Sequence, residues 1–297
     1  MNTRPYLLHA LSPLHAGTGQ AAALIDLPIA RMRATGIPFV PGSSVKGVLR
    51  EAARGKEHEA AVFGPRRDGV EGDTAAALDH AGALIVGDAR LLLLPVRSFS
   101  GTFALVTSPL LLRLAQRDLQ EGGVAAPAAP AIEKPGARVA SLGAHRNVYP
   151  PKKKIYLEEL DLDVREDPAA AAWEQLLVAA LPDEAPVFQG RLVVVDDETM
   201  TFLWETATQI DTRVRLQPET GTVAQGALWT EESLPPETLL IGVLAAQPSM
   251  RPGQAPLPAE RVLELALPEK PFLQFGGKAT VGRGRCRIHP LGQGGRR

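Results

Sequence analysis

The sequence predicts an α+β protein with a sheet covered on one face by helices. Strand-like and helix-like segments alternate irregularly, long stretches separate them, and there is no internal repeat. The 297 residues are 45% hydrophobic and 22% charged, so the chain can bury a sizeable globular core. No apolar run is as long as a transmembrane helix, and the first residues make a poor signal peptide. We therefore expect a cytoplasmic protein that does not contact a membrane.

Local patterns predict the individual elements. Apolar runs indicate strands at residues 6–16, 83–96, 103–107 and 238–246, the second with a glycine that could mark a bulge. A helix should begin at Pro109 after the capping residue Ser108 and end at the Gly122–Gly123 pair. Residues 213–230 read as a β-hairpin whose turn is the PETG segment at 218–221.

The charge is unevenly distributed although the net charge is only -1. Residues 1–56 carry seven Lys/Arg and two acids, and residues 270–297 carry seven Lys/Arg and no acid. The middle of the chain is therefore strongly acidic. Two basic, glycine-rich ends indicate a surface for an anionic partner. The single cysteine, Cys286, excludes an internal disulfide and a cysteine-cluster metal site, and it reads as a small core residue.

The segment IPFVPGSSVKGVLREAARG, residues 37–55, joins an apolar run to a helix. Its serines lie at the helix start, where free backbone N–H groups and the helix dipole favour anions. A phosphate-binding P-loop is excluded because Val48 follows Gly47 where that motif needs lysine. An ordinary serine-capped helix remains an equal alternative for this stretch.

Asp26 is the only acidic residue among the first fifty, in a segment rich in arginine. A carboxylate there could bind a divalent cation or orient an attacking hydroxyl. Composition alone favours the alternative that Asp26 pairs with Arg31 or caps a turn. Glu231 and Glu232 could also contribute to metal binding, but solvated acids are the favoured interpretation.

Four stretches taken together resemble one family. They are SPLHAGTG, IPFVPGSSVKGVLRE, GDARLLLLPVRSFSGTFALVTSP and the closing FGGKATVGRGR. In this order the chain resembles the RAMP superfamily of CRISPR-associated proteins, and within it the backbone subunit of the type III-B (Cmr) RNA-targeting complex. The resemblance runs from residue 12 to about 287. It is weak at 56–80 and 120–185.

The resemblance implies a ferredoxin-like (RRM-like) core with large insertions. Residues 1–297 would form a single RAMP domain, with insertions at about 56–80 and 120–185 and a hairpin "thumb" at about 210–232. Such subunits polymerise along a CRISPR guide RNA beside other type III-B subunits, and they cleave complementary target RNA at regular intervals. This implies a metal-dependent endoribonuclease that uses Mg²⁺ or Mn²⁺.

The resemblance also assigns roles to residues. Asp26 corresponds to the aspartate that cleaves target RNA and would bind the metal, with His15 and Glu231 as further catalytic candidates. A subunit that accepts any guide sequence should hold sugar and phosphate rather than bases, and an aromatic content of 5% makes a base-stacking sheet surface improbable. The expected RNA-binding residues are Ser43, Ser44, Lys46, Arg50, Arg213, Gly277, Lys278, Gly282 and Arg283.

Two alternatives remain open. The chain could be a structural guide-RNA backbone without chemistry of its own, or an endonuclease that processes precursor CRISPR RNA. The processing role would need a fuller His/Tyr/Lys set around the glycine-rich loop, where His289 is the only nearby histidine.

Overall fold

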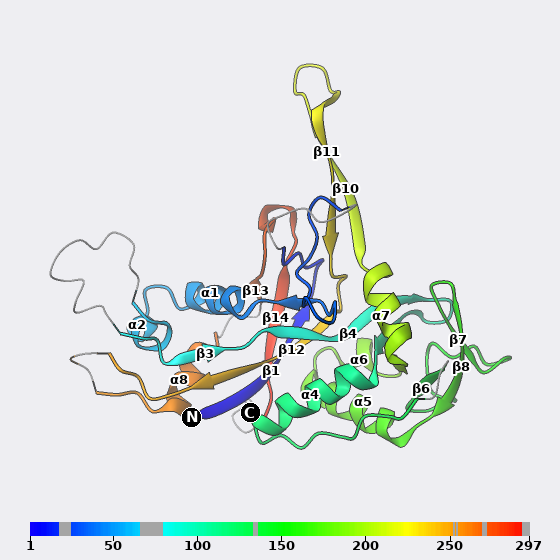
Figure 1. The fold of residues 1–297 in the computed structure, drawn as a ribbon, viewed down its shortest axis with the longest axis horizontal. Helices are drawn as coiled ribbons and strands as arrows, with labels where there is room; N and C mark the ends of the chain where they lie inside the picture. Colours follow the sequence, from blue (N-terminus) through cyan, green and yellow to red (C-terminus); the bar gives the residue numbers. More distant parts are fainter. Residues whose placement is uncertain are drawn as a thin grey trace.

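The structure is a computed structural model that describes residues 1–17, 25–65, 80–132, 136–251, 253, 255–268 and 272–292. Within these residues it is a mixed α+β fold with a main sheet of twelve strands and a separate two-stranded hairpin (Figure 1). The centre of the main sheet has the antiparallel order β14-β1-β12-β4. These strands are β1 Asn2–Ala10, β4 Ala89–Ser98, β12 Leu239–Ala246 and β14 Arg285–Pro290.

Strand β1 brings the two ends of the chain together. Leu7 of β1 is opposite His289 of β14 on one side and Ile241 of β12 on the other. The two basic segments of the sequence therefore lie side by side in the sheet (Figure 1). Three short strands extend this part of the sheet: β2 Phe39–Val40, β3 Leu84–Val86 and β13 Leu273–Gln274.

One face of the central strands packs against two helices. Tyr6 and Leu8 of β1 share a buried cluster with Leu49 of α1 and Val262 of α8. The period of two in a strand places Leu7 on the opposite face. Helix α1 spans Gly42–Ala52, and α8 spans Ala259–Ala266.

The other face is also buried, so the expected sheet with one covered face is wrong for these strands. Leu7 lies in a second cluster with Leu112 of α4, Trp173 of α5 and Phe188 of α6. Cover on both faces explains why every residue of β1 from Arg4 to Ala10 is buried. Because helices cover the face that carries Leu7, RNA bases cannot stack on it, in line with the low aromatic content. The helices are α4 Pro109–Glu121, α5 Pro168–Ala180 and α6 Ala185–Phe188.

Strand β4 continues the sheet into a second half. Its first residues pair with β12, and its later residues pair with β5, where Leu94 is opposite Val106. The order continues β5-β9-β6-β8-β7. The predicted insertion at 120–185 supplies β6, β7, β8 and α5. The predicted insertion at 56–80 contains α2 Glu59–Phe63, and its residues 66–79 lie outside the described residues. The strands are β5 Thr102–Thr107, β6 Ala137–Val139, β7 Lys154–Leu157, β8 Leu160–Glu166 and β9 Leu192–Val195.

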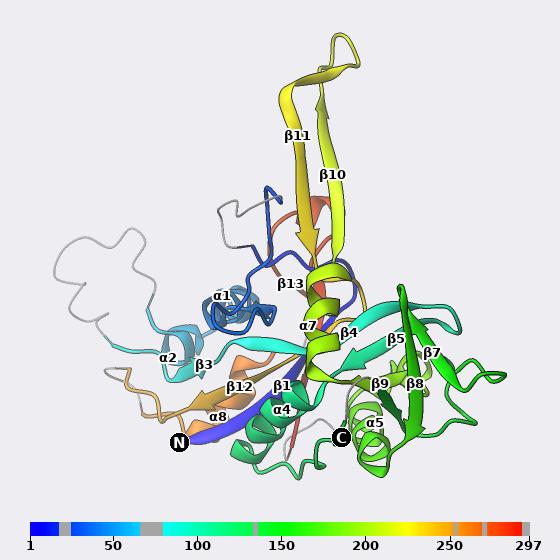
Figure 2. The same ribbon diagram turned by 45° about the vertical axis from the view of Figure 1, so that its right-hand side comes forward.

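The predicted hairpin is confirmed. Strands β10 (Gln209–Leu216) and β11 (Val223–Ser233) project from the body as a long arm, reached through helix α7 (Asp197–Thr206) (Figures 1 and 2). The Gln217 amide donates to the Thr222 carbonyl at 2.8 Å, and Gly221 adopts a φ of 66°. The PETG segment therefore forms the turn.

Two expected strands have different limits. The first strand is at 2–10 rather than 6–16. Pro13 has no N–H to donate to a ladder, and Leu14 instead pairs with Leu234 near the hairpin. The second strand divides into β3 and β4 at Gly87. The helix at Pro109 begins and ends as predicted, with Ser108 at its N-cap.

Cys286 is fully buried, as expected of a core residue, and burial raises its pKa to about 12. Within the described part of the chain, no helix has both the length and the apolar character needed to cross a bilayer.

The two-sided burial of β1 predicts a large effect of Leu7→Ala. Leu7 is 0% exposed, so truncation should lower the free energy of unfolding by about 2–5 kcal/mol. Ile85→Ala is the matched control because Ile85 is a strand residue that is 48% exposed, and it should cost less than about 1 kcal/mol. Urea unfolding measures both variants. Equal, small losses would show that this sheet face is not part of the core.

Candidate active site and RNA interface

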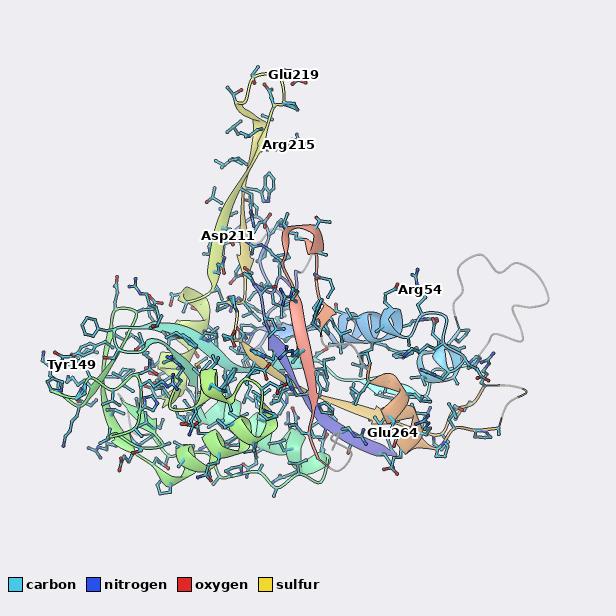
Figure 3. All side chains as sticks on the ribbon, turned by 180° about the vertical axis from the view of Figure 1, so that it is seen from behind. Arg54, Tyr149, Asp211, Arg215, Glu219 and Glu264 are labelled. Carbon is cyan, nitrogen blue, oxygen red and sulfur yellow. The ribbon has the colours of Figure 1, made fainter. Side chains whose placement is uncertain are left out.

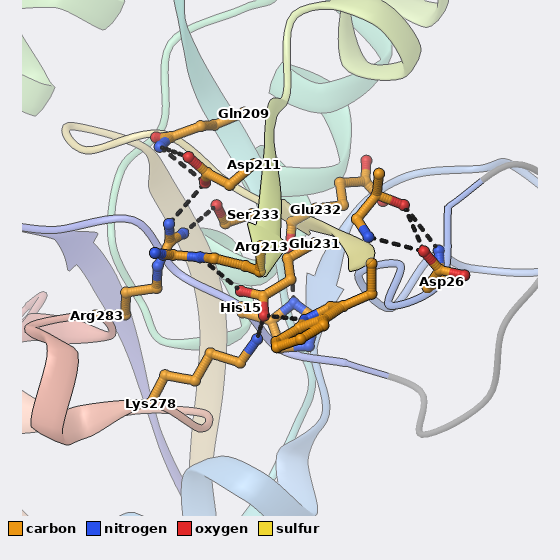
Figure 4. Close-up of polar contacts among 12 residues, drawn as sticks. His15, Asp26, Gln209, Asp211, Arg213, Glu231, Glu232, Ser233, Lys278 and Arg283 are labelled. Carbon is orange, nitrogen blue, oxygen red and sulfur yellow. Dashed lines mark hydrogen bonds and ion pairs between the residues drawn. The ribbon is translucent and has the colours of Figure 1, made fainter. Parts of the chain in front are cut away.

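The last residues of β11, 229–233, form the hairpin base, where distant parts of the chain meet (Figure 4). Leu14 and Leu234 exchange two backbone hydrogen bonds of 2.9 Å. Leu27 donates its N–H to the Thr230 carbonyl at 3.1 Å and accepts from the Glu232 N–H at 3.0 Å. Both described segments of the loop that follows β1 are therefore fixed against the hairpin base.

Asp26 is exposed, and Thr230 orients its carboxylate. Oδ2 of Asp26 accepts from the Thr230 N–H at 2.7 Å and from the Thr230 hydroxyl at 3.0 Å. The backbone hydrogen bond from Thr230 is the main cause that lowers the pKa of Asp26. The carboxylate is therefore ionised at neutral pH. Arg31, the alternative partner considered from the sequence, instead binds Glu232 at 2.5 Å.

Glu232 is buried, so its interpretation as a solvated acid is wrong. It is 2% exposed, and its Oε1 accepts from Arg31 at 2.5 Å and from the Thr208 hydroxyl at 2.9 Å. Its Oε2 accepts from the Ile29 N–H at 3.0 Å. The side chain thus holds the segment that carries Asp26.

Glu231 is also buried, at 3% exposure, and it binds three partners. Its Oε1 accepts from the Trp229 indole N–H at 2.6 Å and pairs with the Lys278 ammonium, while Arg213 Nε lies 3.5 Å from Oε2. Burial opposes ionisation, but Lys278, Trp229 and Arg213 together outweigh it and lower the pKa of Glu231. This geometry makes Glu231 a positioning residue for two predicted RNA-binding cations. A catalytic role for Glu231 stays a prediction.

Arg283 is buried as well, with 6% exposure, and its guanidinium is used inside the chain. It donates to Asp211 Oδ2 at 2.6 Å and to the Ser233 hydroxyl at 3.0 Å (Figure 4). Burial opposes ionisation of Asp211, but the hydrogen bonds from Arg283 and Gln209 and the charges of Arg283 and Arg213 together outweigh it and lower the pKa of Asp211. Arg283 therefore joins the C-terminal loop to the hairpin base, and its phosphate contact stays a prediction.

The glycine loop, residues 276–284, contains glycines of two kinds. Gly276 and Gly284 have φ values of 67° and 73°, and a Cβ there would lie 2.1 Å from the His15 carbonyl and 1.9 Å from the Phe275 carbonyl. The fold itself requires both. Gly277 and Gly282 are exposed and face open space, and only Gly282 has a positive φ. Nothing within the described residues requires glycine at 277.

His15 lies beside Glu231 and Lys278 at the hairpin base, whereas Asp26 lies at its other edge (Figure 4). The Nδ1 of His15 is 2.6 Å from the Glu232 carbonyl. A carbonyl can only accept, so Nδ1 carries the proton and Nε2 keeps a lone pair in the neutral ring. Among the described residues, no hydrogen bond or ion pair joins Asp26, His15 and Glu231 directly, although the hairpin base supports all three.

The start of α1 differs from the serine-capped alternative. Pro41 is the N-cap residue and makes no side-chain cap, which places Ser43 and Ser44 in the exposed first turn. Asp88 accepts the Gly42 N–H at 2.7 Å. Both serine hydroxyls therefore remain on the surface at the positive end of the helix.

The two cations of α1 have partners within the protein. Lys46 donates to the Leu84 carbonyl at 3.1 Å, and burial, followed by the charge of Arg50, lowers the pKa of Lys46. Arg50 donates to the Gly64 carbonyl at 3.0 Å and pairs with Glu59 at 3.3 Å. Both side chains link α1 to neighbouring segments of the chain. Their contacts with RNA stay predictions.

Sequence reasoning missed Thr230, Asp211 and Ser233 as supports of the site. The available signal was the polar run TEES at 230–233, which ends an otherwise β-prone segment. Four successive polar residues in a strand place some of them on a buried face, where each needs a partner.

The ion pairs of Glu231 predict a pH-dependent effect of Glu231→Gln. At pH 7 the change should cost about 1–3 kcal/mol because buried charged hydrogen bonds are lost. The pKa of Glu231 is lowered below 4.5 in the folded state, so its contribution is present above that pH and is lost as the pH falls. The difference from wild type in urea unfolding should therefore shrink at pH 4.

The matched control is Glu264→Gln, at an exposed residue of α8 that pairs with Arg261 (Figure 3). It should change the unfolding free energy by less than about 0.5 kcal/mol at both pH values. A Glu231→Gln loss that is absent, or equal at pH 7 and pH 4, would contradict the assignment of an ionised anchor.

Comparisons with known proteins agree with this architecture. The curated protein "CRISPR system Cmr endoribonuclease Cmr4" of Pyrococcus furiosus is 33% identical over 291 residues, which cover 95% of this chain and 93% of the relative. The crystal structure of oligomeric Cmr4 from the same organism matches with a TM-score of 0.68 and 27% identity over 98% of both chains.

A cryo-EM structure of the type III-B Cmr-beta complex bound to cognate target RNA contains a chain with the same fold. Its TM-score is 0.72 at 18% identity, over 98% of this chain and 97% of that chain. The model of the RAMP superfamily matches residues 7–287, which is nearly the whole sequence. The chain belongs to the RAMP superfamily.

Proposed function

We propose that this chain is an endoribonuclease subunit of a type III-B effector, which binds guide RNA, assembles with copies of itself and cleaves complementary target RNA. The observation that carries the proposal is Asp26, an exposed, ionised carboxylate fixed by Thr230. It lies in a chain 33% identical to a protein named as an endoribonuclease. The likeness to a chain of a complex bound to target RNA supports the same substrate.

The central strands support the finer proposal of a ferredoxin-like core. Such a core has a βαββαβ order and four antiparallel strands with both helices on one face. Here β14-β1-β12-β4 are antiparallel, α1 lies between β1 and β4 in the chain, and α8 lies between β12 and β14. Both helices share the cluster that contains Tyr6 and Leu8.

The lowered pKa of Asp26 favours an electrostatic role over that of a proton acceptor, because a more acidic carboxylate is a weaker base. We propose that Asp26 orients the attacking 2′-hydroxyl of the target and provides one ligand to Mg²⁺ or Mn²⁺. A divalent cation, when bound there, stabilises negative charge that develops at the phosphate.

Asp26 could hold such a cation as one ligand, with RNA and water as the others. Among the described residues, Asp26 does not belong to a cluster of three metal-ligating side chains. Mg²⁺ commonly binds one or two carboxylates and takes its other ligands from water and phosphate. The target RNA would therefore complete the site. His15, whose Nε2 keeps a lone pair in the neutral ring, is the proposed proton carrier.

The guide RNA is proposed to lie along the start of α1 and the glycine loop. Ser43 and Ser44 offer exposed hydroxyls at the positive end of a helix. Gly277 has space around it that the fold does not use, which would let a sugar–phosphate backbone approach closely. Lys278 adds charge beside it, held in place by Glu231.

The hairpin is proposed as the thumb that contacts a neighbouring copy. Its outer part exposes apolar side chains that the chain itself leaves uncovered, namely Val214, Leu216, Val223 and Leu228. Figure 3 shows Arg215 and Glu219 on the same part of the arm, far from the body. An exposed apolar arm needs a covering partner, and a second copy provides one.

Asp26→Asn tests the catalytic proposal. The change keeps the size and removes the charge of an exposed residue, so the fold and guide binding should survive. Target cleavage by the assembled complex should fall on the order of 10²-fold or more. The assay is a time course of labelled complementary RNA with Mg²⁺ or Mn²⁺, read as a ladder of products.

Glu264→Gln in every copy is the control for removal of an exposed carboxylate, and it should leave the cleavage rate unchanged. A complex with Asp26→Asn in every copy that cuts at the normal rate would remove the catalytic proposal. That result would support the structural-backbone alternative, in which Asp26 only holds Thr230.

Deletion of residues 218–222 tests the thumb. Within the described part of the chain the turn tip lies away from the body, so the thermal midpoint of the isolated chain should stay within about 2 °C of wild type. The spacing or yield of target fragments should change, because the tip no longer reaches the next copy. Unchanged spacing and yield from complexes of normal stoichiometry would contradict the assignment.

A further inference from the structure

His9, Glu184 and His289 form a cluster outside the proposed RNA site. His9 of β1 is opposite Arg287, and Leu7 is opposite His289, so both histidines project from the same sheet face. Glu184 immediately precedes α6, which packs on that face through Phe188. One ligand atom from each of the three residues lies within 4.8 Å of the others.

The cluster contains buried polar atoms that lack hydrogen-bond partners. His9 is 0% exposed and Glu184 is 7% exposed, while His289 is partly buried. Among the described residues, the Nδ1 of His9, the Oε2 of Glu184 and the Nε2 of His289 have no hydrogen bond. Each such atom costs free energy unless something binds it. Three of them in one place point to a ligand that accepts electron pairs.

A carboxylate fixes the orientation of His9. Its Nε2 lies 2.8 Å from Oε2 of Glu237, and an ionised carboxylate can only accept. The proton is therefore on Nε2, and Nδ1 keeps its lone pair when the ring is neutral. Carboxylate–histidine pairs of this kind commonly support metal-ligating histidines.

The charges around the cluster also favour a cation. Glu184 is a member of the cluster, Glu237 contacts it through His9, and Asp183 lies near enough to act on His289. Arg287 is the opposing charge and pairs with Glu184 through its other oxygen, Oε1. The carboxylates thus outnumber the single guanidinium.

We propose that His9, Glu184 and His289 bind one divalent transition-metal ion, with Zn²⁺ the best match to two imidazole nitrogens and a carboxylate oxygen. Ligand atoms around a tetrahedral zinc ion lie about 3.3 Å apart, so small rotations of the side chains close the site. The ion ties β1, β14 and the start of α6 together. With three ligands from the protein, a water molecule would complete the tetrahedron, and the site is distinct in its residues from the cation proposed at Asp26.

The test is made on the full chain, purified without a polyhistidine tag and dialysed against EDTA. Zinc is then added, excess is removed, and the bound metal is measured by mass spectrometry. The expected result is one zinc ion per chain. With free zinc about 100-fold above its dissociation constant, the thermal midpoint should rise by roughly 5 °C, and EDTA should reverse the rise.

Two conservative variants test the ligands. Glu184→Gln can keep the hydrogen bond to Arg287, and His289→Gln changes a residue that is only partly buried, so both should fold. Each should weaken zinc binding at least about 10-fold. His58→Gln is the matched histidine control, and Asp26→Asn removes the other proposed cation site. Both should bind zinc as wild type does.

Three results would overturn the proposal. The first is a chain that retains no zinc and shows no change in thermal midpoint, which would mean that ordered water satisfies the cluster. The second is zinc binding that is unchanged in Glu184→Gln and His289→Gln. The third is loss of the bound zinc in Asp26→Asn, which would assign the ion to the RNA site. None of these bears on whether Asp26 cleaves RNA.

Discussion

The rest of the site depends on the polar contacts of the hairpin base. Successive side chains of β11 hold segments that are far apart in the sequence: Thr230 binds Asp26, Glu231 binds Lys278, Glu232 binds Arg31, and Ser233 binds Arg283. Two of these contacts fix the loop after β1, and the other two fix the C-terminal glycine loop. Because the glutamates are buried, each must keep its partner, and this constraint gives both loops one position.

The buried and the exposed polar side chains of the site therefore have different roles. Buried cations such as Arg283 hold the protein together, whereas the exposed polar groups are those that we propose contact RNA. Those groups are the Asp26 carboxylate at one edge of the hairpin base and the first turn of α1 with its two serines. A guide and a target strand would then contact different elements. Because the hairpin that supports both is also the proposed contact with a neighbouring copy, assembly and cleavage would share one structural unit.

Local signals in the sequence predicted part of this arrangement. Ser108, Pro109 and Gly122 set the limits of α4, and the PETG turn set the hairpin, because capping and turn residues act on their own neighbours. The burial of Glu232 could not be predicted, because its partners Arg31 and Thr208 lie 201 and 24 residues away. The Pro41 cap was missed for the same reason, since Asp88, from the connection between β3 and β4, contacts that helix start.

The most direct test of the account is whether Thr230 acts on cleavage through Asp26. Thr230→Val removes the hydroxyl and keeps the shape and backbone N–H, while Thr230→Ser keeps the hydroxyl. The account predicts that valine slows target cleavage by roughly 10-fold, as expected for one lost orienting hydrogen bond, and that serine restores it. In an Asp26→Asn background, the valine change should have no further effect. An unchanged rate with valine, or an equal loss in both backgrounds, would contradict the central role of this contact.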